Sequence, residues 1–176
     1  MWTWYASRAA GLVSLVLLTV TVLLGIAGTT GAATARWPRF AVARLHRNLS
    51  LLGPAFVALH VLTAVLDGYV PIRWLDVVVP FGSAYGPFWL GLGAVALDLL
   101  LAVITTSLLR ARLGLRAWRA VHLSAYACWP LAVLHGWGIG GADSTTVWVL
   151  ALTLSCVVAV LAGLLWRARS WSGVAR

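Results

Sequence analysis

All four histidines of the chain lie in two apolar segments, and both segments separate them by nearly the same distance. The stretch LHRNLSLLGPAFVALH places His46 and His60 fourteen positions apart, and VHLSAYACWPLAVLH places His122 and His135 thirteen apart. In an α-helix with a rise of ~1.5 Å per residue, these spacings correspond to ~21 and ~20 Å. If each segment is helical, each carries two imidazole rings at two well-separated levels.

The composition is that of a membrane protein. Of the 176 residues, 62% are apolar and only 10% are charged, whereas soluble domains are nearer a quarter charged. The net charge of +9 comes from thirteen arginines that lie between long apolar runs. Contact with anionic lipid explains them better than nucleic-acid binding does. The two cysteines form neither a CxxC nor a CxxCH motif, so neither a zinc or redox pair of cysteines nor covalently attached heme is expected.

Five apolar segments are long enough to cross a ~30 Å bilayer core as helices of about 20 residues. The absence of alternating ten-residue strands argues against a membrane β-barrel. The expected fold is therefore an all-α, multi-pass bundle in the cell membrane, forming one domain over the whole chain. The five predicted helices cover about residues 9–28, 40–66, 88–109, 118–137 and 146–166.

The arginines predict the orientation of this bundle. If five helices alternate, the connection before the second helix, the connection before the fourth helix and the C-terminal tail lie on one side. That side carries most of the arginines, namely Arg36, Arg39, Arg44, Arg47, Arg110, Arg112, Arg116, Arg119, Arg167, Arg169 and Arg176. The positive-inside rule then places the N-terminus outside and the C-terminus in the cytoplasm. Tryptophans near the predicted ends resemble an aromatic belt, with Trp37, Trp118 and Trp166 inside and Trp74, Trp89 and Trp137 outside.

Signal-peptide cleavage after the small residues of GAATAR, residues 31–36, is an alternative for the first helix. It would place the arginine-rich stretch 36–47 outside, against the charge pattern, and Arg8 alone makes a poor positive n-region. An uncleaved first helix is the better interpretation.

In this topology the second and fourth helices run in the same direction. His46 and His122 therefore share one depth, and His60 and His135 share another. Two pairs at two depths are what two stacked bis-histidine b-type hemes require, since imidazole is a common axial ligand of heme iron. The levels are too far apart for one zinc site. Histidines that only form hydrogen bonds between helices remain the alternative.

The angular fit is good on only one of the two helices. Fourteen α-helical steps return within ~40° of the starting direction, whereas thirteen miss it by ~140°. Pro130 lies between His122 and His135, and we expect a kink there to turn the later histidine toward the second helix.

The paired spacings, with ARLHRNLSLLGPAFVALH, TTSLLRARLGLRAWRAVHLSAYACWPLAVLHGWGIGGAD and SRAAGLVSLVLLTVTVLLG, resemble the ferric reductase-like transmembrane domain. This superfamily includes ferric reductases, NADPH oxidases and the heme-binding membrane subunit of periplasmic methionine sulfoxide reductase. The resemblance implies that His46, His60, His122 and His135 are axial ligands and that electrons cross the membrane from heme to heme.

The chain also departs from the larger members of that family. They have six helices with ligands on the third and fifth, whereas here the ligands fall on the second and fourth. Only about ten residues follow Trp166, so we expect no flavin or nicotinamide domain here and a separate donor instead. The stretch GWGIGG, residues 136–141, matches GxGxxG but has no strand before it, so it is not a dinucleotide site.

Arginines and one aspartate are candidate supporting residues. Heme propionates prefer arginine partners, and Arg47 and Arg119 are the candidates beside the inner histidine pair, with Arg44 nearby and Arg73 for the outer pair. Binding to lipid phosphate is the simpler role for most of them. Asp98 is the only acid within a span, so it is a candidate proton or quinone site, with a hydrogen bond to Ser124 as its structural alternative.

The sequence thus predicts a transmembrane diheme b-type cytochrome. Electrons would enter at the His46/His122 heme from a separate flavoprotein or from quinol. They would leave from the His60/His135 heme to an acceptor outside, such as ferric iron, oxygen or a redox protein. The rival hypothesis is a small non-redox transporter that uses the histidines and Asp98 as a proton relay.

Overall fold

Helices make up almost all of the part of the chain that the computed structural model describes, residues 2–30 and 38–174, and the four longest are apolar. Within those residues there is no strand. The elements are α1 (Trp2–Thr30), α2 (Arg39–Leu66), α3 (Trp74–Val78), α4 (Pro87–Leu108), α5 (Arg110–His122), α6 (Ala125–Ile139), the 3₁₀ helix η1 (Gly141–Thr145) and α7 (Val147–Val174). The expectations placed on residues 31–36, on Trp37 and on Arg176 fall outside the described residues.

Four of these helices are long and apolar enough to cross a membrane: α1, α2, α4 and residues Val147–Ser170 of α7. Few side chains are fully buried, and leucines such as Leu59 on α2 and Leu165 on α7 are 45% and 62% exposed. In a soluble protein such apolar surface would be a liability, whereas in a bilayer it faces lipid. The predicted all-α, multi-pass membrane architecture is therefore confirmed.

The predicted fourth helix, 118–137, is not one continuous helix. It is divided between α5 and α6 at Leu123–Ser124, and α5 begins at Arg110, directly after α4, with a kink at Gly114, where φ is 78°. Tight i→i+3 hydrogen bonds surround the division, from Ser124 N to the Val121 carbonyl and from Ala127 N to the Ser124 carbonyl. Pro130 lies in the following turn and lacks the N–H that would donate to the Tyr126 carbonyl.

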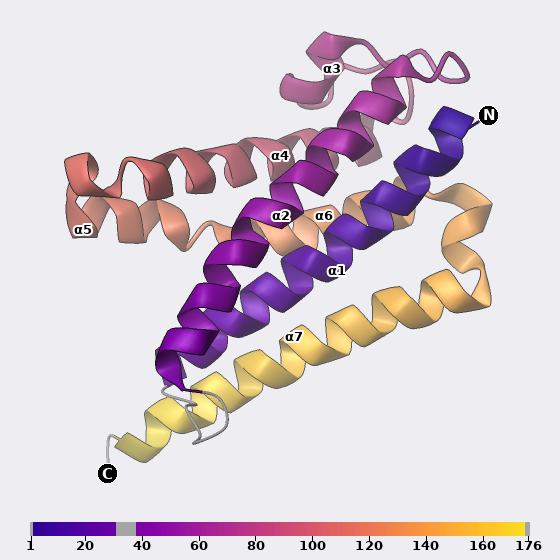
Figure 1. The fold of residues 1–176 in the computed structure, drawn as a ribbon. Helices are drawn as coiled ribbons and strands as arrows, with labels where there is room; N and C mark the ends of the chain where they lie inside the picture. Colours follow the sequence, from indigo (N-terminus) through magenta and orange to yellow (C-terminus); the bar gives the residue numbers. More distant parts are fainter. Residues whose placement is uncertain (1, 31–37, 175–176) are drawn as a thin grey trace.

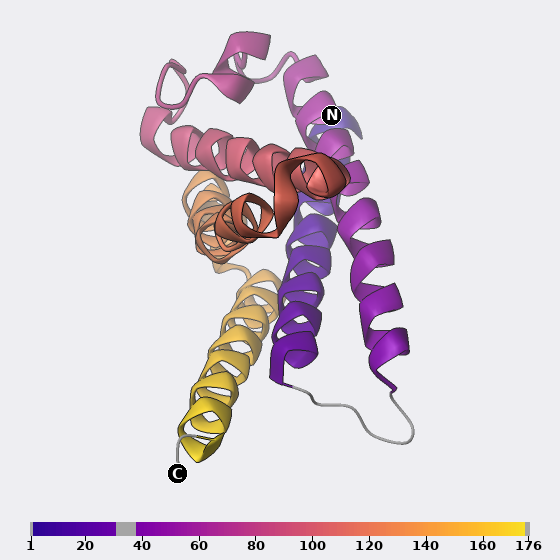
Figure 2. The ribbon, with the colours of Figure 1, turned by 90° about the vertical axis from the view of Figure 1, so that its left-hand side faces the viewer.

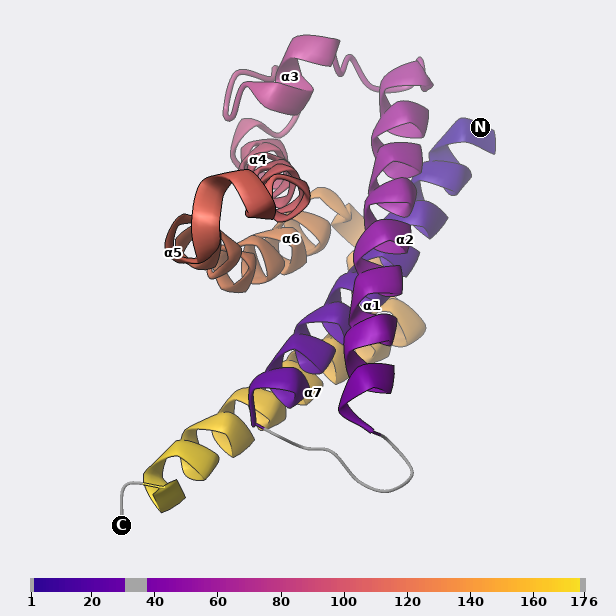
Figure 3. The ribbon, with the colours of Figure 1, turned by 60° about the vertical axis from the view of Figure 1, so that its left-hand side comes forward.

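Helix α1 lies at the centre of the arrangement and contacts α2, α6 and α7, whereas α4 packs on α6 (Figures 1 and 3). A cluster of buried side chains joins α1, α6 and α7, formed by Leu15, Trp129, Cys156 and Val160. Viewed from the side, α4, α5 and α6 form a group beside the α1–α2 pair (Figure 2).

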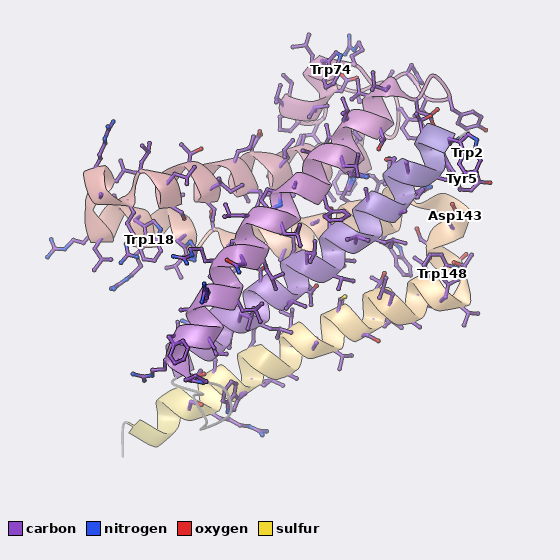
Figure 4. The ribbon with its side chains drawn as sticks, in the orientation of Figure 1. Trp2, Tyr5, Trp74, Trp118, Asp143 and Trp148 are labelled. Atoms are coloured by element: carbon purple, nitrogen blue, oxygen red, sulfur yellow. The ribbon has the colours of Figure 1, made fainter. Side chains whose placement is uncertain are left out.

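The connections alternate between two ends of the molecule. The start of α2, the α4–α5 corner and the C-terminus lie at one end, and the N-terminus, α3 and η1 lie at the other (Figure 1). Trp118 lies at the first end, and Trp2, Trp74 and Trp148 lie at the second (Figure 4). The arginine-rich segments that the structure describes therefore gather at one end, which we call the arginine side.

Close contact between α4 and α6 depends on glycine. A Cβ atom added at Gly138 would clash with the Trp89 ring, whereas one added at Gly136 would meet nothing within 4 Å. We expect Gly138→Ala to lower the free energy of unfolding in detergent by about 1–3 kcal/mol, as overpacking does. Gly136→Ala on the same helix is the matched control for helix propensity. Equal melting temperatures for the two variants would contradict this packing.

The segment between α2 and α4 is held by an ion pair. The Arg73 guanidinium lies 2.8 Å from Oδ1 of Asp76, and the Arg73 backbone N–H donates to Oδ2 of that carboxylate at 2.9 Å. These hydrogen bonds lower the pKa of Asp76 and raise that of Arg73. A group whose pKa is lowered on folding stabilises the fold above its unfolded value and loses this effect as the pH falls through its folded value.

Amide hydrogen exchange around residues 73–79 should therefore change little from pH 7 to 5 once intrinsic rates are corrected. Protection should be lost only below the ordinary aspartate range, near pH 4 and lower. In the Asp76→Asn variant, the amides of residues 73–79 should exchange without protection at every pH. Loss of protection between pH 7 and 5 in the unmodified protein would contradict the assignment.

Candidate functional site

The four histidines meet in two pairs between α2 and the α5–α6 segment, as the spacing predicts. The ring centres of His46 and His122 are 6.3 Å apart with an interplanar angle of 68°. Those of His60 and His135 are 6.2 Å apart at 78°. We call the first the arginine-side pair, because His46 and His122 lie nearer the arginine-rich connections. The second is the cavity pair.

The division between α5 and α6 explains how both histidines of this segment can face α2. Thirteen α-helical steps leave the direction of His135 ~140° away from that of His122 around the helix axis. A 3₁₀ turn rotates the chain by ~120° per residue instead of ~100°. The i→i+3 hydrogen bonds donated by Ser124, Tyr126 and Ala127 mark overwound steps here, each of which recovers ~20° of the difference in the direction needed. Pro130 was expected to turn the later histidine by a kink of its own. The adjustment instead lies in the turn before it.

Three of the four rings donate Nδ1–H to a backbone carbonyl. His46 Nδ1 lies 3.0 Å from the Thr21 oxygen, His60 Nδ1 2.7 Å from the Ser7 oxygen, and His135 Nδ1 2.9 Å from the Trp89 oxygen. A carbonyl oxygen can only accept, so Nδ1 must carry the proton in each ring. In a neutral imidazole, Nε2 then keeps its lone pair, and no hydrogen bond among the described residues uses it.

A glycine follows each accepting carbonyl by four residues and lies against the ring. A Cβ would crowd the ring at Gly11 and Gly93, whereas at Gly25 it would make ordinary van der Waals contact. A Cβ at Gly11 would lie 3.1 Å from His60 Nδ1, one at Gly25 3.5 Å from His46 Cε1, and one at Gly93 2.5 Å from His135 Nδ1. We call each combination of a carbonyl at position i and a glycine at i+4 a ring seat. The seats are Ser7/Gly11 and Thr21/Gly25 on α1 and Trp89/Gly93 on α4.

These ring seats were not predicted from the sequence. The spacing of glycines could have indicated them, because Gly11 and Gly25 are fourteen residues apart on α1, the same spacing as His46 and His60 on the antiparallel α2. The fourth ring differs. His122 Nδ1 is buried without a hydrogen-bond partner among the described residues, and its ring stacks on Trp118 with 4.8 Å between the ring centres.

The cavity pair lines a largely apolar cavity of about 650 Å³ between parts of α1, α2, α4, α6 and α7. This volume lies within the range of roughly 300–1,000 Å³ typical of small-molecule and cofactor sites. Among the described residues, Arg8 is the only lysine or arginine in the lining, which also includes Asp76 and Asp143. The Arg8 guanidinium donates to the Gly140 carbonyl at 2.9 Å and lies 3.8 Å from the Asp143 carboxylate. Arg8 was not predicted as a site residue from the sequence.

The other predicted site residues lie elsewhere. Arg47 and Arg119 are exposed at the arginine side, and neither has a partner among the described residues. Arg73, expected beside the outer pair, is bound to Asp76, which lies in the lining of the cavity. Asp98 is half-buried on α4 without a hydrogen bond to any described residue, and the Ser124 hydroxyl donates to the Val121 carbonyl rather than to Asp98.

These features define a membrane protein with paired histidines between helices. The family described as ferric reductase like transmembrane component matches residues 10–138, which include all four histidines. The chain belongs to this family, whose transmembrane domains generally bind heme and serve in membrane electron transfer. No curated protein and no solved structure matches the chain.

Proposed function

We propose that the chain is a transmembrane b-type cytochrome that holds two hemes, one at each histidine pair, and carries electrons one at a time across the membrane. In this proposal His46 and His122 bind one iron, and His60 and His135 bind the other. The N-terminus lies outside and the arginine side faces the cytoplasm, following the positive-inside rule. The observation that carries the proposal is the pairing of the four rings, three of which have Nδ1 bound to a backbone carbonyl and Nε2 without a hydrogen bond among the described residues.

The spacing of each pair fits a metal between the rings. Metal–imidazole bonds of about 2 Å on each side, with about 1 Å from each nitrogen to its ring centre, give roughly 6 Å between ring centres. The observed values are 6.3 and 6.2 Å. No group of three or more histidine, cysteine or acidic side chains that could hold a metal occurs among the described residues. A metal that takes only two ligands from the protein, as heme iron does, therefore suits these sites better than a metal ion held by protein side chains alone.

The side chains around the pairs have definable tasks. The Nδ1–H bonds fix ring orientation and make Nε2 a stronger ligand, as partners of metal-binding histidines generally do. Arg8, which lines the cavity, is the cation placed to meet an anionic propionate there. Arg47 and Arg119 remain candidates for that task at the arginine-side pair. Bound heme supplies one-electron cycling of iron between ferric and ferrous states.

The donor and acceptor are proposed only by class. Electrons enter at the arginine-side pair from a separate flavoprotein or from a lipid-soluble quinol, and leave from the cavity pair to an acceptor outside. A second groove, of about 680 Å³, lies between α6 and α7 and includes Leu123, the neighbour of His122. Arg167 donates to the Tyr126 hydroxyl at 2.6 Å on its lining. An apolar groove with such a polar pair suits the ring of a quinol.

An absorbance spectrum of the purified protein, oxidised and then reduced with dithionite, tests the proposal. We expect low-spin b-type spectra with two hemes per chain. His60→Ala and His135→Ala should each leave one heme, as should His46→Ala. A folded protein made with heme available that contains none would contradict the cytochrome and favour the proton-relay transporter, with Asp98 as its acid.

Gly93→Ala tests the seat under His135. The added methyl group would occupy the position of the ring, so His135 must move away from the Trp89 carbonyl. We expect the heme affinity of the cavity pair to fall by roughly 10–100-fold, the usual cost of losing an outer-shell partner. Heme titration of the apoprotein measures this change. Gly28→Ala is the control, since a Cβ there meets nothing within 4 Å, and equal affinities in both variants would contradict the seat.

A further inference from the structure

The two histidine pairs are not equivalent, because only three of the four rings have a seat. Each α1 seat lies opposite α2, and the two seats are fourteen residues apart. On α4, the seat Trp89/Gly93 serves His135. Fourteen residues further along α4, the corresponding positions are Val103 and Ser107, so the glycine is missing. Only the arginine-side pair therefore contains a ring without a seat.

A different arrangement occupies this fourth position. The indole N–H of Trp118 donates to the Ser107 hydroxyl at 3.2 Å, and the Trp118 ring stacks on His122 at 27°. The Arg110 guanidinium lies 4.3 Å from the centre of the same indole ring. His122 thus ends a stack of a cation, an indole and an imidazole. Its ring is oriented by face-to-face packing rather than by a hydrogen bond.

We propose that this missing seat makes His122 the weakest electron-donating ligand of the four and gives the two hemes different reduction potentials. The inference rests on the proposed function. A hydrogen bond from Nδ1–H to a carbonyl makes imidazole more basic, and a more basic ligand favours ferric over ferrous iron. Both ligands of the cavity pair have this bond, whereas only His46 has it in the arginine-side pair. The arginine-side heme is therefore the more easily reduced of the two.

This difference bears on the direction of transfer. With heme bound at both pairs, the site held by His46 and His122 would have the higher potential. Electron transfer from it to the cavity pair would then be uphill and would depend on rapid removal of the electron by the acceptor. The missing hydrogen bond on His122 would therefore favour residence of the electron at the arginine-side pair.

The first test examines the rings without requiring heme. The chain has only four histidines, so NMR of protein labelled with ¹⁵N-histidine reports on the site alone. In the apoprotein we expect three slowly exchanging Nδ1–H protons and one that exchanges fast with deuterium. His122→Ala should remove only the fast signal. Four protected protons, or a fast proton assigned to another ring, would overturn the missing seat even if heme binding is confirmed.

The second test is a redox titration of the diheme protein, with His46→Ala and His60→Ala to assign each potential. A tenfold difference in the preference for ferrous iron corresponds to ~59 mV for one electron. We expect the arginine-side potential to be higher by about that amount. Equal or inverted potentials would overturn the proposal.

Arg110→Gln separates the hydrogen-bond effect from that of the nearby charge, and Arg112→Gln, on the same side of the Gly114 kink, is its matched control. The difference between the two reduction potentials should persist in both variants. If it disappears in Arg110→Gln alone, the cation rather than the missing seat causes it. Absence of heme from the unmodified protein would instead contradict the proposed function and leave the exchange experiment valid.

Discussion

An imidazole ring inside a membrane must satisfy its N–H group, and the arrangement of this chain depends on how it does so. The bilayer offers no water, so an unpaired donor is costly there. Helix carbonyls are already used by their own helix, but each oxygen has a second lone pair. Ser7, Thr21 and Trp89 offer that lone pair to histidine. At Gly11 and Gly93, four residues later, a Cβ would crowd the ring, whereas at Gly25 it would make ordinary contact.

This constraint sets the positions of the helices. Helix α1 carries two seats at the spacing of the two histidines of α2, so the two helices must align antiparallel in one register. Helix α4 carries a third seat and must therefore lie against α6. The lipid faces contribute little to this specificity, because apolar side chains such as Leu59 are as well solvated by lipid as by another helix. Small residues and polar contacts between helices decide the packing.

The break between α5 and α6 has a related role. A regular helix over 118–137 would hold one of its two histidines facing away from α2. The tight turn at Leu123–Ser124 overwinds the chain and corrects the direction. The same local change separates His122 from the helix that carries His135. Its ring is held by Trp118 instead, and that difference underlies the inequality of the two pairs.

The sequence by itself determined the membrane class, four of the five helices and the pairing of the histidines by depth. These follow from apolar run length and from the fixed rise of a helix, which are local properties. It could not determine which carbonyl meets each ring, because Ser7 and His60 are 53 residues apart and their contact depends on the register between α1 and α2. It also did not show that Arg73 pairs with Asp76 or that Arg8 lines the cavity. Only the tertiary structure decides such matters, because charges and glycines act through the neighbours that the packing of helices brings to them.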